Sequence, residues 1–195
     1  VRPLISPHFP TNFLPFAARL KEAGMRTLGI ADAAYESLPE ELRRNLTEYY
    51  RVDDMEDYNQ VYKAVAFFAF KYGKIDRIES HNEHWLALDA RLRQDFNVLG
   101  YRPEDVDIVT HKSKMKKVFR QIGLPVANGR VFSGTEDALS LAEELGYPVI
   151  VKPDNGVGAG DTYKLGTKEE LQHFLDQHAQ YSTYIMEEFI PGEMV

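Results

Sequence analysis

The sequence predicts an α/β protein of two domains, and three observations carry this prediction. In the first half, short apolar runs alternate with longer amphipathic stretches, which is typical of a parallel sheet whose strands are joined by helices. The second half changes character, because it opens with a basic helix and contains a glycine-rich loop. The length of 195 residues corresponds to between one and two domains of about 150 residues each.

The first half is expected to alternate strands with helices. In its first helix, Phe13, Phe16 and Leu20 recur at helical spacing, and Gly24 stands where that helix should end. The expected strands are a run ending at residue 5 and the ranges 25–31, 48–52 and 75–79, and the expected helices are 12–23, 39–46, 55–72 and 85–96.

Ligands of parallel α/β sheets bind at the carboxyl ends of the strands. His8 follows the first expected strand, and His81 and Glu83 follow the strand expected at 75–79. These three side chains are therefore candidate substrate contacts. A metal site formed by His81 and His84 is disfavoured, since no third ligand stands at a suitable spacing.

The second half is expected to form a smaller sheet with its own helices, and the domain boundary is placed between residues 109 and 110. The expected helices are 111–122, 135–145 and 167–178, and the expected strands are 129–132, 149–152, 162–165 and 183–189. Thr167 and Glu170 form the spacing of a capping box at the start of the last helix.

Composition excludes several classes of protein. The 30 acidic and 23 basic residues give a formal charge of −7, which argues against a general nucleic-acid binder because phosphate neutralisation requires a basic surface. The sequence contains no cysteine, so disulfides, thiolate zinc sites and cysteine nucleophiles are excluded. No apolar run approaches the roughly 18 residues of a membrane span, and the first residues lack the pattern of a signal peptide. A soluble cytoplasmic protein without nucleic-acid or membrane partners is expected.

The glycine-rich loop after the strand at 149–152 is the most specific chemical feature. Gly156, Gly158 and Gly160 alternate with other residues, and Lys152 ends the preceding strand. Such a loop exposes backbone N–H groups that bind anions, and the lysine adds a point charge, so the pair suits a polyphosphate. The alternative is a hairpin loop in which glycine only permits positive φ.

The expected helix at 111–122 carries a basic stripe. Lys112, Lys116 and Arg120 repeat every four residues and share one face, where like charges repel one another. Lys112 also stands in the first turn, which is the unfavourable end of the helix dipole for a cation. The stripe is interpreted either as a solvated face or as part of a site for an anionic ligand.

A third feature near the end of the sequence is a carboxylate on an apolar strand, in the run Met186-Glu187-Glu188-Phe189-Ile190-Pro191-Gly192-Glu193. In order and spacing, the basic helix, the lysine strand with its loop, and this run resemble the ATP-grasp superfamily of ligases, which includes biotin carboxylase and carbamoyl phosphate synthetase. The resemblance extends from about residue 110 to the end. The first half is similar to the Rossmann-like pre-ATP-grasp domain with a parallel sheet.

The resemblance implies roles for the two lysines and the glycines. Lys112 matches the first phosphate-binding lysine, although His111 stands where the family has an aspartate. Lys152 matches the second lysine, which binds α- and β-phosphate oxygens, and the glycine loop matches the cover over the β- and γ-phosphates.

The same resemblance implies that the run after Met186 holds the nucleoside. Glu187 would meet the N6 amine of adenine, and the backbones of Glu188 and Ile190 would meet the edge of the ring. Glu193 would contact the ribose, although many members place that acid one residue later.

The implied function is an ATP-dependent carboxylate–amine ligase that uses ATP and Mg²⁺ to form an acyl phosphate, which an amine or another nucleophile then attacks. Residues 1–109 would be the pre-ATP-grasp domain, and 110–195 a truncated N-terminal part of the ATP-grasp domain. The magnesium ligands are expected after Val195, so this chain alone should be inactive and no catalytic residue is assigned. A small-molecule carboxylate and a nucleophile are the implied substrates, and a homodimer is compatible with the resemblance.

Two alternatives stay open. The first is a nucleotide-binding or nucleotide-sensing α/β protein without ligase chemistry. The second is a dinucleotide binder that uses the first half, which is disfavoured because Ser6-Pro7-His8-Phe9-Pro10 stands where a glycine fingerprint would follow the first strand.

Overall fold

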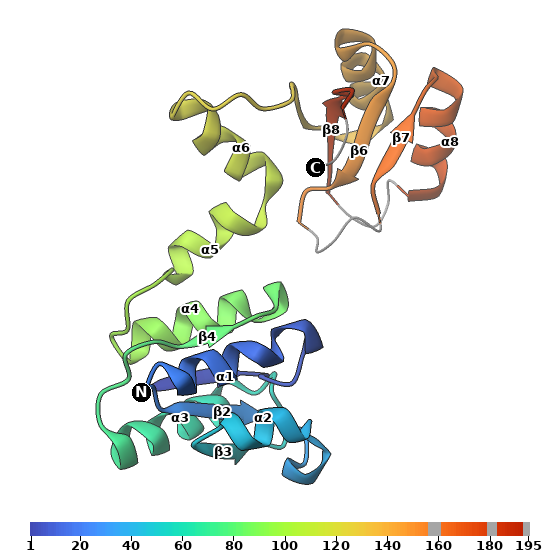
Figure 1. The fold of residues 1–195 in the computed structure, drawn as a ribbon. Helices are drawn as coiled ribbons and strands as arrows, with labels where there is room; N and C mark the ends of the chain where they lie inside the picture. Colours follow the sequence, from blue (N-terminus) through green and yellow to red (C-terminus); the bar gives the residue numbers. More distant parts are fainter. Residues whose placement is uncertain (156–160, 179–182, 193–195) are drawn as a thin grey trace. The chain divides into compact units, whose positions relative to one another are not determined.

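A computed structural model describes residues 1–155, 161–178 and 183–192 of the chain. The chain divides into two compact units, which span Val1–Val106 and Asp107–Val195 and are called unit 1 and unit 2 (Figure 1). In the part of the chain that is described, no helix combines the length and the apolar character needed to cross a membrane.

Unit 1 is built on a parallel sheet with the strand order β3-β2-β1-β4. Its strands are β1 (Arg2–Ile5), β2 (Thr27–Ala31), β3 (Glu48–Arg51) and β4 (Glu79–Ser80). Each pairing is parallel, which confirms the expected α/β sheet. The strand order reverses at β1, because the chain leaves β3 on one side and returns as β4 on the other. In open α/β sheets the crevice at such a reversal is where ligands bind.

Helices cover both faces of this sheet. The helical segments of unit 1 are η1 (Thr11–Phe13), α1 (Leu14–Glu22), η2 (Tyr35–Ser37), α2 (Glu40–Asn45), α3 (Tyr58–Tyr72), η3 (Glu83–Trp85) and α4 (Leu86–Asp95). Leu4 packs with Leu20 of α1 and Leu42 of α2 in one core. Its neighbour Ile5 packs with Phe68 of α3 in the second core. Because successive side chains of β1 point to opposite faces of the sheet, this strand contributes to two separate cores.

The strand expected at 75–79 is wrong in its extent, since β4 comprises Glu79–Ser80 only. The reason is a buried side chain that forms hydrogen bonds with the backbone directly before β4. The Nε and Nη2 atoms of Arg93 donate to the carbonyl of Ile78 at 2.9 and 2.7 Å, where a longer strand would need a ladder partner. Asp89 then accepts from the backbone and the hydroxyl of Ser80, and burial raises the pKa of Asp89 to about 6.

A helix that the sequence reading omitted, α5 (Pro103–Thr110), spans the division between the two units. The signals for it are present. Pro103 is its first residue, Glu104 and Asp105 stand in its first turn, and Asp105 accepts from the backbone N–H of Arg102 at 2.8 Å.

Unit 2 contains an antiparallel sheet with the strand order β5-β8-β6-β7. Its strands are β5 (Gly129–Val131), β6 (Val149–Pro153), β7 (Tyr163–Leu165) and β8 (Tyr184–Glu188), and its further helices are α6 (Lys112–Gln121), α7 (Gly134–Leu145) and α8 (Lys168–His178). These elements agree with the expected ones to within a few residues at each end. The central pair, β6 and β8, sets Ile150 opposite Glu187 and Lys152 opposite Ile185.

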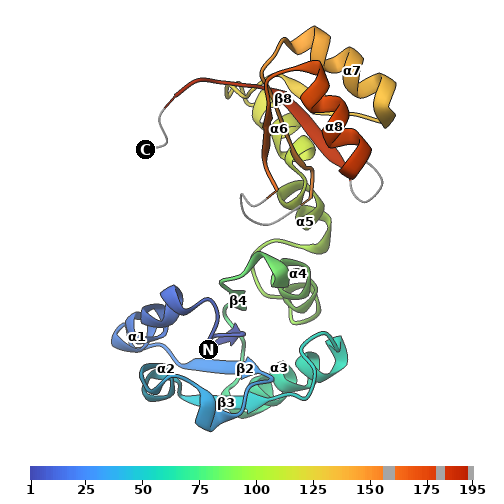
Figure 2. The same cartoon turned by 90° about the vertical axis from the view of Figure 1, so that its right-hand side faces the viewer.

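The two faces of the unit 2 sheet differ in character. On one face, Val149 and Val151 of β6 and Met186 of β8 pack with α7 and α8 in a single apolar core, beside which Figure 2 shows both helices. Because side chains alternate along a strand, Lys152 and Glu187 belong to the other face. The sheet therefore separates an apolar core from a face that carries charge.

Candidate functional site

The charged face of unit 2 brings together two of the predicted site residues, Lys152 and Glu187. They lie on neighbouring antiparallel strands and are diagonal to each other in the register, a separation that a long side chain can span. Lys152 Nζ lies 2.7 Å from Glu187 Oε2. We call the set formed by Lys116, Lys152 and Glu187 the lysine–glutamate cluster.

Lys116 completes this cluster from helix α6. Its ammonium group donates to Glu187 Oε1, so the two carboxylate oxygens of Glu187 serve two different lysines. The side chains of Lys116 and Glu187 are 11% and 8% exposed, which means that this ion pair is almost fully withdrawn from water. Burial alone would raise the pKa of Glu187, but the hydrogen bonds from Lys116 and Lys152 outweigh it, so the pKa lies below its ordinary value.

The first turn of α6 is fixed by a residue at the end of β6. Asp154 is buried and accepts from the Ser113 backbone N–H and from the Ser113 hydroxyl, both at 2.7 Å. The Asp154 carbonyl accepts from the Lys112 N–H at 2.9 Å. His111 occupies the N-cap position without a capping side-chain bond. A carboxylate at a helix N-terminus is favourable. Here Asp154, which directly follows β6, supplies this carboxylate, and the N-cap residue His111 does not.

This cap places the ammonium group of Lys112 at the end of β6, the strand that carries Lys152. The ammonium group of Lys112 donates to the Pro153 carbonyl at 2.8 Å, and Pro153 directly follows Lys152. The carboxyl end of β6 and the start of α6 therefore converge, and each contributes an ammonium group. A cavity of about 330 Å³ lies along α6, β5 and β8, and its lining is Ser113, Lys116, Arg120, Gly129, Arg130, Val131 and Ile185.

Other predicted nucleotide contacts lie near the end of β8. Glu188 is tied to the segment before β5, because its N–H donates to the Asn128 carbonyl at 2.9 Å and its carboxylate accepts from the Asn128 N–H at 2.7 Å. Ile190 is exposed. The remaining predicted contacts, Gly156, Gly158, Gly160 and Glu193, lie outside the described residues.

The predicted substrate contacts lie at the carboxyl edge of the unit 1 sheet, where the strand order reverses. Ser6 directly after β1 has a φ of 50°, and the ring of His81 after β4 stacks on Phe13 with centroids 4.7 Å apart. Burial lowers the pKa of His81. Among the described residues, His8 Nδ1 and His81 Nε2 are buried without a hydrogen-bond partner. Glu83 lies in η3, next to His84, whose ring pairs with Glu56 at 2.6 Å.

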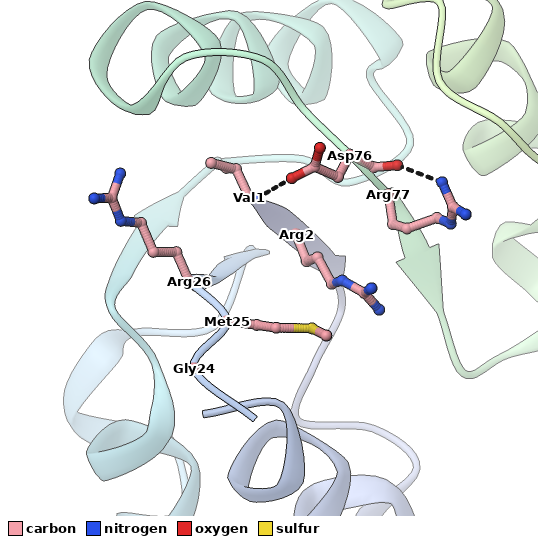
Figure 3. A pocket seen from close by; sticks show the side chains of 7 residues that line it. All are labelled: Val1, Arg2, Gly24, Met25, Arg26, Asp76 and Arg77. Atoms are coloured by element: carbon pink, nitrogen blue, oxygen red, sulfur yellow. Dashed lines mark hydrogen bonds and ion pairs between the residues drawn. The ribbon is translucent and has the colours of Figure 1, made fainter. Parts of the chain in front are cut away.

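A larger hollow of about 530 Å³ lies at the opposite edge of the unit 1 sheet (Figure 3). Its lining is Val1, Arg2, Gly24, Met25, Arg26, Asp76 and Arg77, and the amino group of Val1 forms an ion pair with Asp76. Arg2 begins β1, so the hollow is at the amino ends of the strands. Ligands of open parallel sheets bind at the carboxyl ends, and this hollow is therefore not the candidate site.

Sequence reasoning missed the two polar residues that organise the site. The sequence puts Lys116 in the basic stripe but does not indicate that it is the partner of Glu187, and it indicates no role for Asp154. The signal for Asp154 was its position directly after the lysine strand. Over residues 1–155, 161–178 and 183–192, no group of three or more histidine or acidic side chains is placed to hold a metal ion.

Comparison with known protein families identifies the segment that contains this site. Residues 111–191 match the family described as the carbamoyl-phosphate synthase L chain, ATP binding domain. The match begins at the N-cap of α6 and ends just beyond β8, so it includes all three members of the lysine–glutamate cluster.

Relatives and solved structures agree with this match. An L-arginine-specific L-amino acid ligase of Bacillus subtilis is 34% identical over 130 residues, which cover 67% of this chain and 30% of the ligase. A carbamoyl phosphate synthase large chain of Thermotoga neapolitana is 32% identical over 88 residues, which cover 45% of this chain and 8% of that protein.

Two solved structures share the fold along nearly the whole chain. The N5-carboxyaminoimidazole synthetase from Staphylococcus aureus, complexed with ADP, has a TM-score of 0.74 at 18% identity and covers 98% of this chain and 48% of its own. The L-amino acid ligase from Bacillus licheniformis has a TM-score of 0.68 at 20% identity and covers 98% and 44%. The chain thus spans less than half the length of these relatives.

Proposed function

Residues 111–191 belong to the ATP-grasp superfamily, and from this premise we propose that the protein binds ATP at the charged face of unit 2. The observation that carries the proposal is the convergence of Lys112 and Lys152 where α6 begins and β6 ends. Lys112 and Lys152 present ammonium groups as hydrogen-bond donors, and phosphate oxygens are strong acceptors. Each charge-assisted hydrogen bond contributes about 1.5–3 kcal/mol.

The charge of the site fits a polyphosphate. Lys116 and Lys152 share the single carboxylate of Glu187, so the lysine–glutamate cluster carries one net positive charge. A net positive charge at this face attracts an anionic ligand such as a polyphosphate. Glu187, Glu188 and Ile190 would then flank the adenine at the end of β8, and Gly156, Gly158, Gly160 and Glu193 would complete the nucleotide site.

The proposed reaction is the activation of a small-molecule carboxylate as an acyl phosphate, followed by attack of an amine or another nucleophile. The L-amino acid ligase relative, which is 34% identical over 130 residues, supports it. Mg²⁺ would neutralise the phosphates during transfer. The role proposed for the described residues is to bind and orient the nucleotide.

Residues 1–109, which include unit 1, would be the pre-ATP-grasp domain, and residues 110–195 the beginning of the ATP-grasp domain. We place the carboxylate substrate at the carboxyl edge of β1 and β4, with His8, His81 and Glu83 as its contacts. The supporting observations are the reversal of strand order at this edge and the two buried ring nitrogens that have no partner among the described residues.

A comparison of ATP with adenosine tests the proposed nucleotide site. In calorimetric titrations of the purified protein, ATP should bind at least about 100-fold more tightly than adenosine, because two lysine–phosphate hydrogen bonds are worth about 3 kcal/mol or more. Equal affinities for the two ligands, or no binding of ATP, would contradict the proposal.

A further inference from the structure

We propose that Lys116 is a positioning residue for the nucleotide, because it neutralises Glu187 and thereby leaves the ammonium group of Lys152 available for phosphate. This inference rests on the proposed function, since it concerns how the same site is prepared for ATP. It assigns a role to a lysine one helical turn after Lys112, on the same face of α6.

The geometry supports a division of labour between the two lysines of the lysine–glutamate cluster. Lys116 is 11% exposed and ends on one oxygen of Glu187, whereas Lys152 is 24% exposed and lies 2.7 Å from the other oxygen. The more buried lysine is therefore the permanent partner of the carboxylate. Lys152 is the more accessible of the two. It lies near the end of β6 next to Pro153, whose carbonyl accepts from the ammonium group of Lys112.

The charge balance explains why two lysines are needed. A buried carboxylate that has lost its partner is strongly unfavourable, so Glu187 requires at least one ammonium group at all times. If Lys152 were its single partner, binding of a phosphate by Lys152 would leave Glu187 unpaired. With Lys116 in place, Lys152 can turn from Glu187 to the phosphates while the carboxylate stays neutralised.

A double-mutant cycle separates this role from a merely structural one. Lys116→Met should weaken ATP binding about 10-fold, because Lys152 is then held by Glu187 and only a small fraction of the protein is competent to bind phosphate. Adding Glu187→Gln removes the charge that holds Lys152, and the double variant should return to within about threefold of the wild-type affinity for ATP. Adenosine affinity should not change in Lys116→Met. Glu187 is itself a proposed contact of adenine, and Gln keeps a carbonyl oxygen that accepts from the N6 amine, so adenosine affinity is measured beside ATP affinity in the double variant to separate an effect on the phosphates from one on the base. Lys116→Arg, which keeps the charge, should bind ATP like the wild type.

Each outcome of the cycle decides the question. Wild-type affinity in Lys116→Met would overturn the proposal, and so would a double variant that binds ATP as weakly as the single one, since that result shows a structural role. If Lys116→Met alone fails to fold by circular dichroism, the double variant, in which no buried charge is unpaired, is compared directly with the wild type. Affinity within about threefold then supports the proposal, and a loss of about 10-fold or more overturns it. A wild-type protein that binds no ATP would instead show that the proposed function is wrong.

Discussion

Gly129→Ala should destabilise unit 2 by about 3–5 kcal/mol. Gly129 has a φ of 145°, and a Cβ at this position would lie 2.1 Å from the carbonyl oxygen of Met186 and 2.7 Å from the Cα of Glu187. Both contacts are with backbone, which cannot turn away as a side chain can. Strand β5 would have to separate from β8 beside the lysine–glutamate cluster. Urea unfolding followed by far-UV circular dichroism measures the loss.

A second glycine provides the matched control for this substitution. Gly146 after α7 has a φ of 77°, but a Cβ there would meet nothing within 4 Å. Gly146→Ala therefore tests a positive φ without a steric clash, at a cost of about 1–3 kcal/mol. The single tryptophan, Trp85, lies in unit 1, so its fluorescence should report an unchanged transition in both variants. Equal stability of the two alanine variants would show that β5 does not need this close approach.

Lys152→Ala should weaken ATP binding at least about 10-fold. The substitution removes one charge-assisted hydrogen bond to phosphate and leaves Glu187 paired with Lys116, so the fold should persist. The expected loss of affinity comes from the phosphate contacts, so adenosine should bind equally well to the variant and to the wild type. Calorimetric titration of the purified variant with both ligands measures this difference.

Lys168→Ala is the control for the loss of a positive charge in the same unit. Lys168 is the first residue of α8, which packs on the apolar face of the sheet, and its ammonium group pairs with Glu143 at 2.8 Å. A general electrostatic contribution would weaken ATP binding similarly in both variants, whereas the proposed site predicts an effect at Lys152 alone. Unchanged ATP affinity in Lys152→Ala would remove Lys152 from the site.

The sequence was sufficient for the elements of unit 2 because their signals are local. Val149, Ile150 and Val151 form a short run of β-branched residues, which is typical of a strand. The structure confirms the strand and buries Val149 and Val151 against α7 and α8. A parallel sheet in unit 1 was predictable for the same reason, since each strand is followed by a helical stretch.

What could not be predicted depends on contacts between distant residues. The spacing of the basic stripe cannot show that Lys116 meets Glu187, which is 71 residues later in the chain. Nor can it show that Asp154 caps α6 from 41 residues away. The overlong strand expected at 75–79 failed similarly, because Arg93 satisfies the carbonyl of Ile78 from helix α4.

The most direct test of the central claim is a crystal structure of the protein with bound ADP. We expect phosphate oxygens within about 3 Å of the Nζ atoms of Lys112 and Lys152, with Lys116 still paired to Glu187. A nucleotide bound at the carboxyl edge of β1 and β4 in unit 1, or one whose phosphates contact neither lysine, would contradict it.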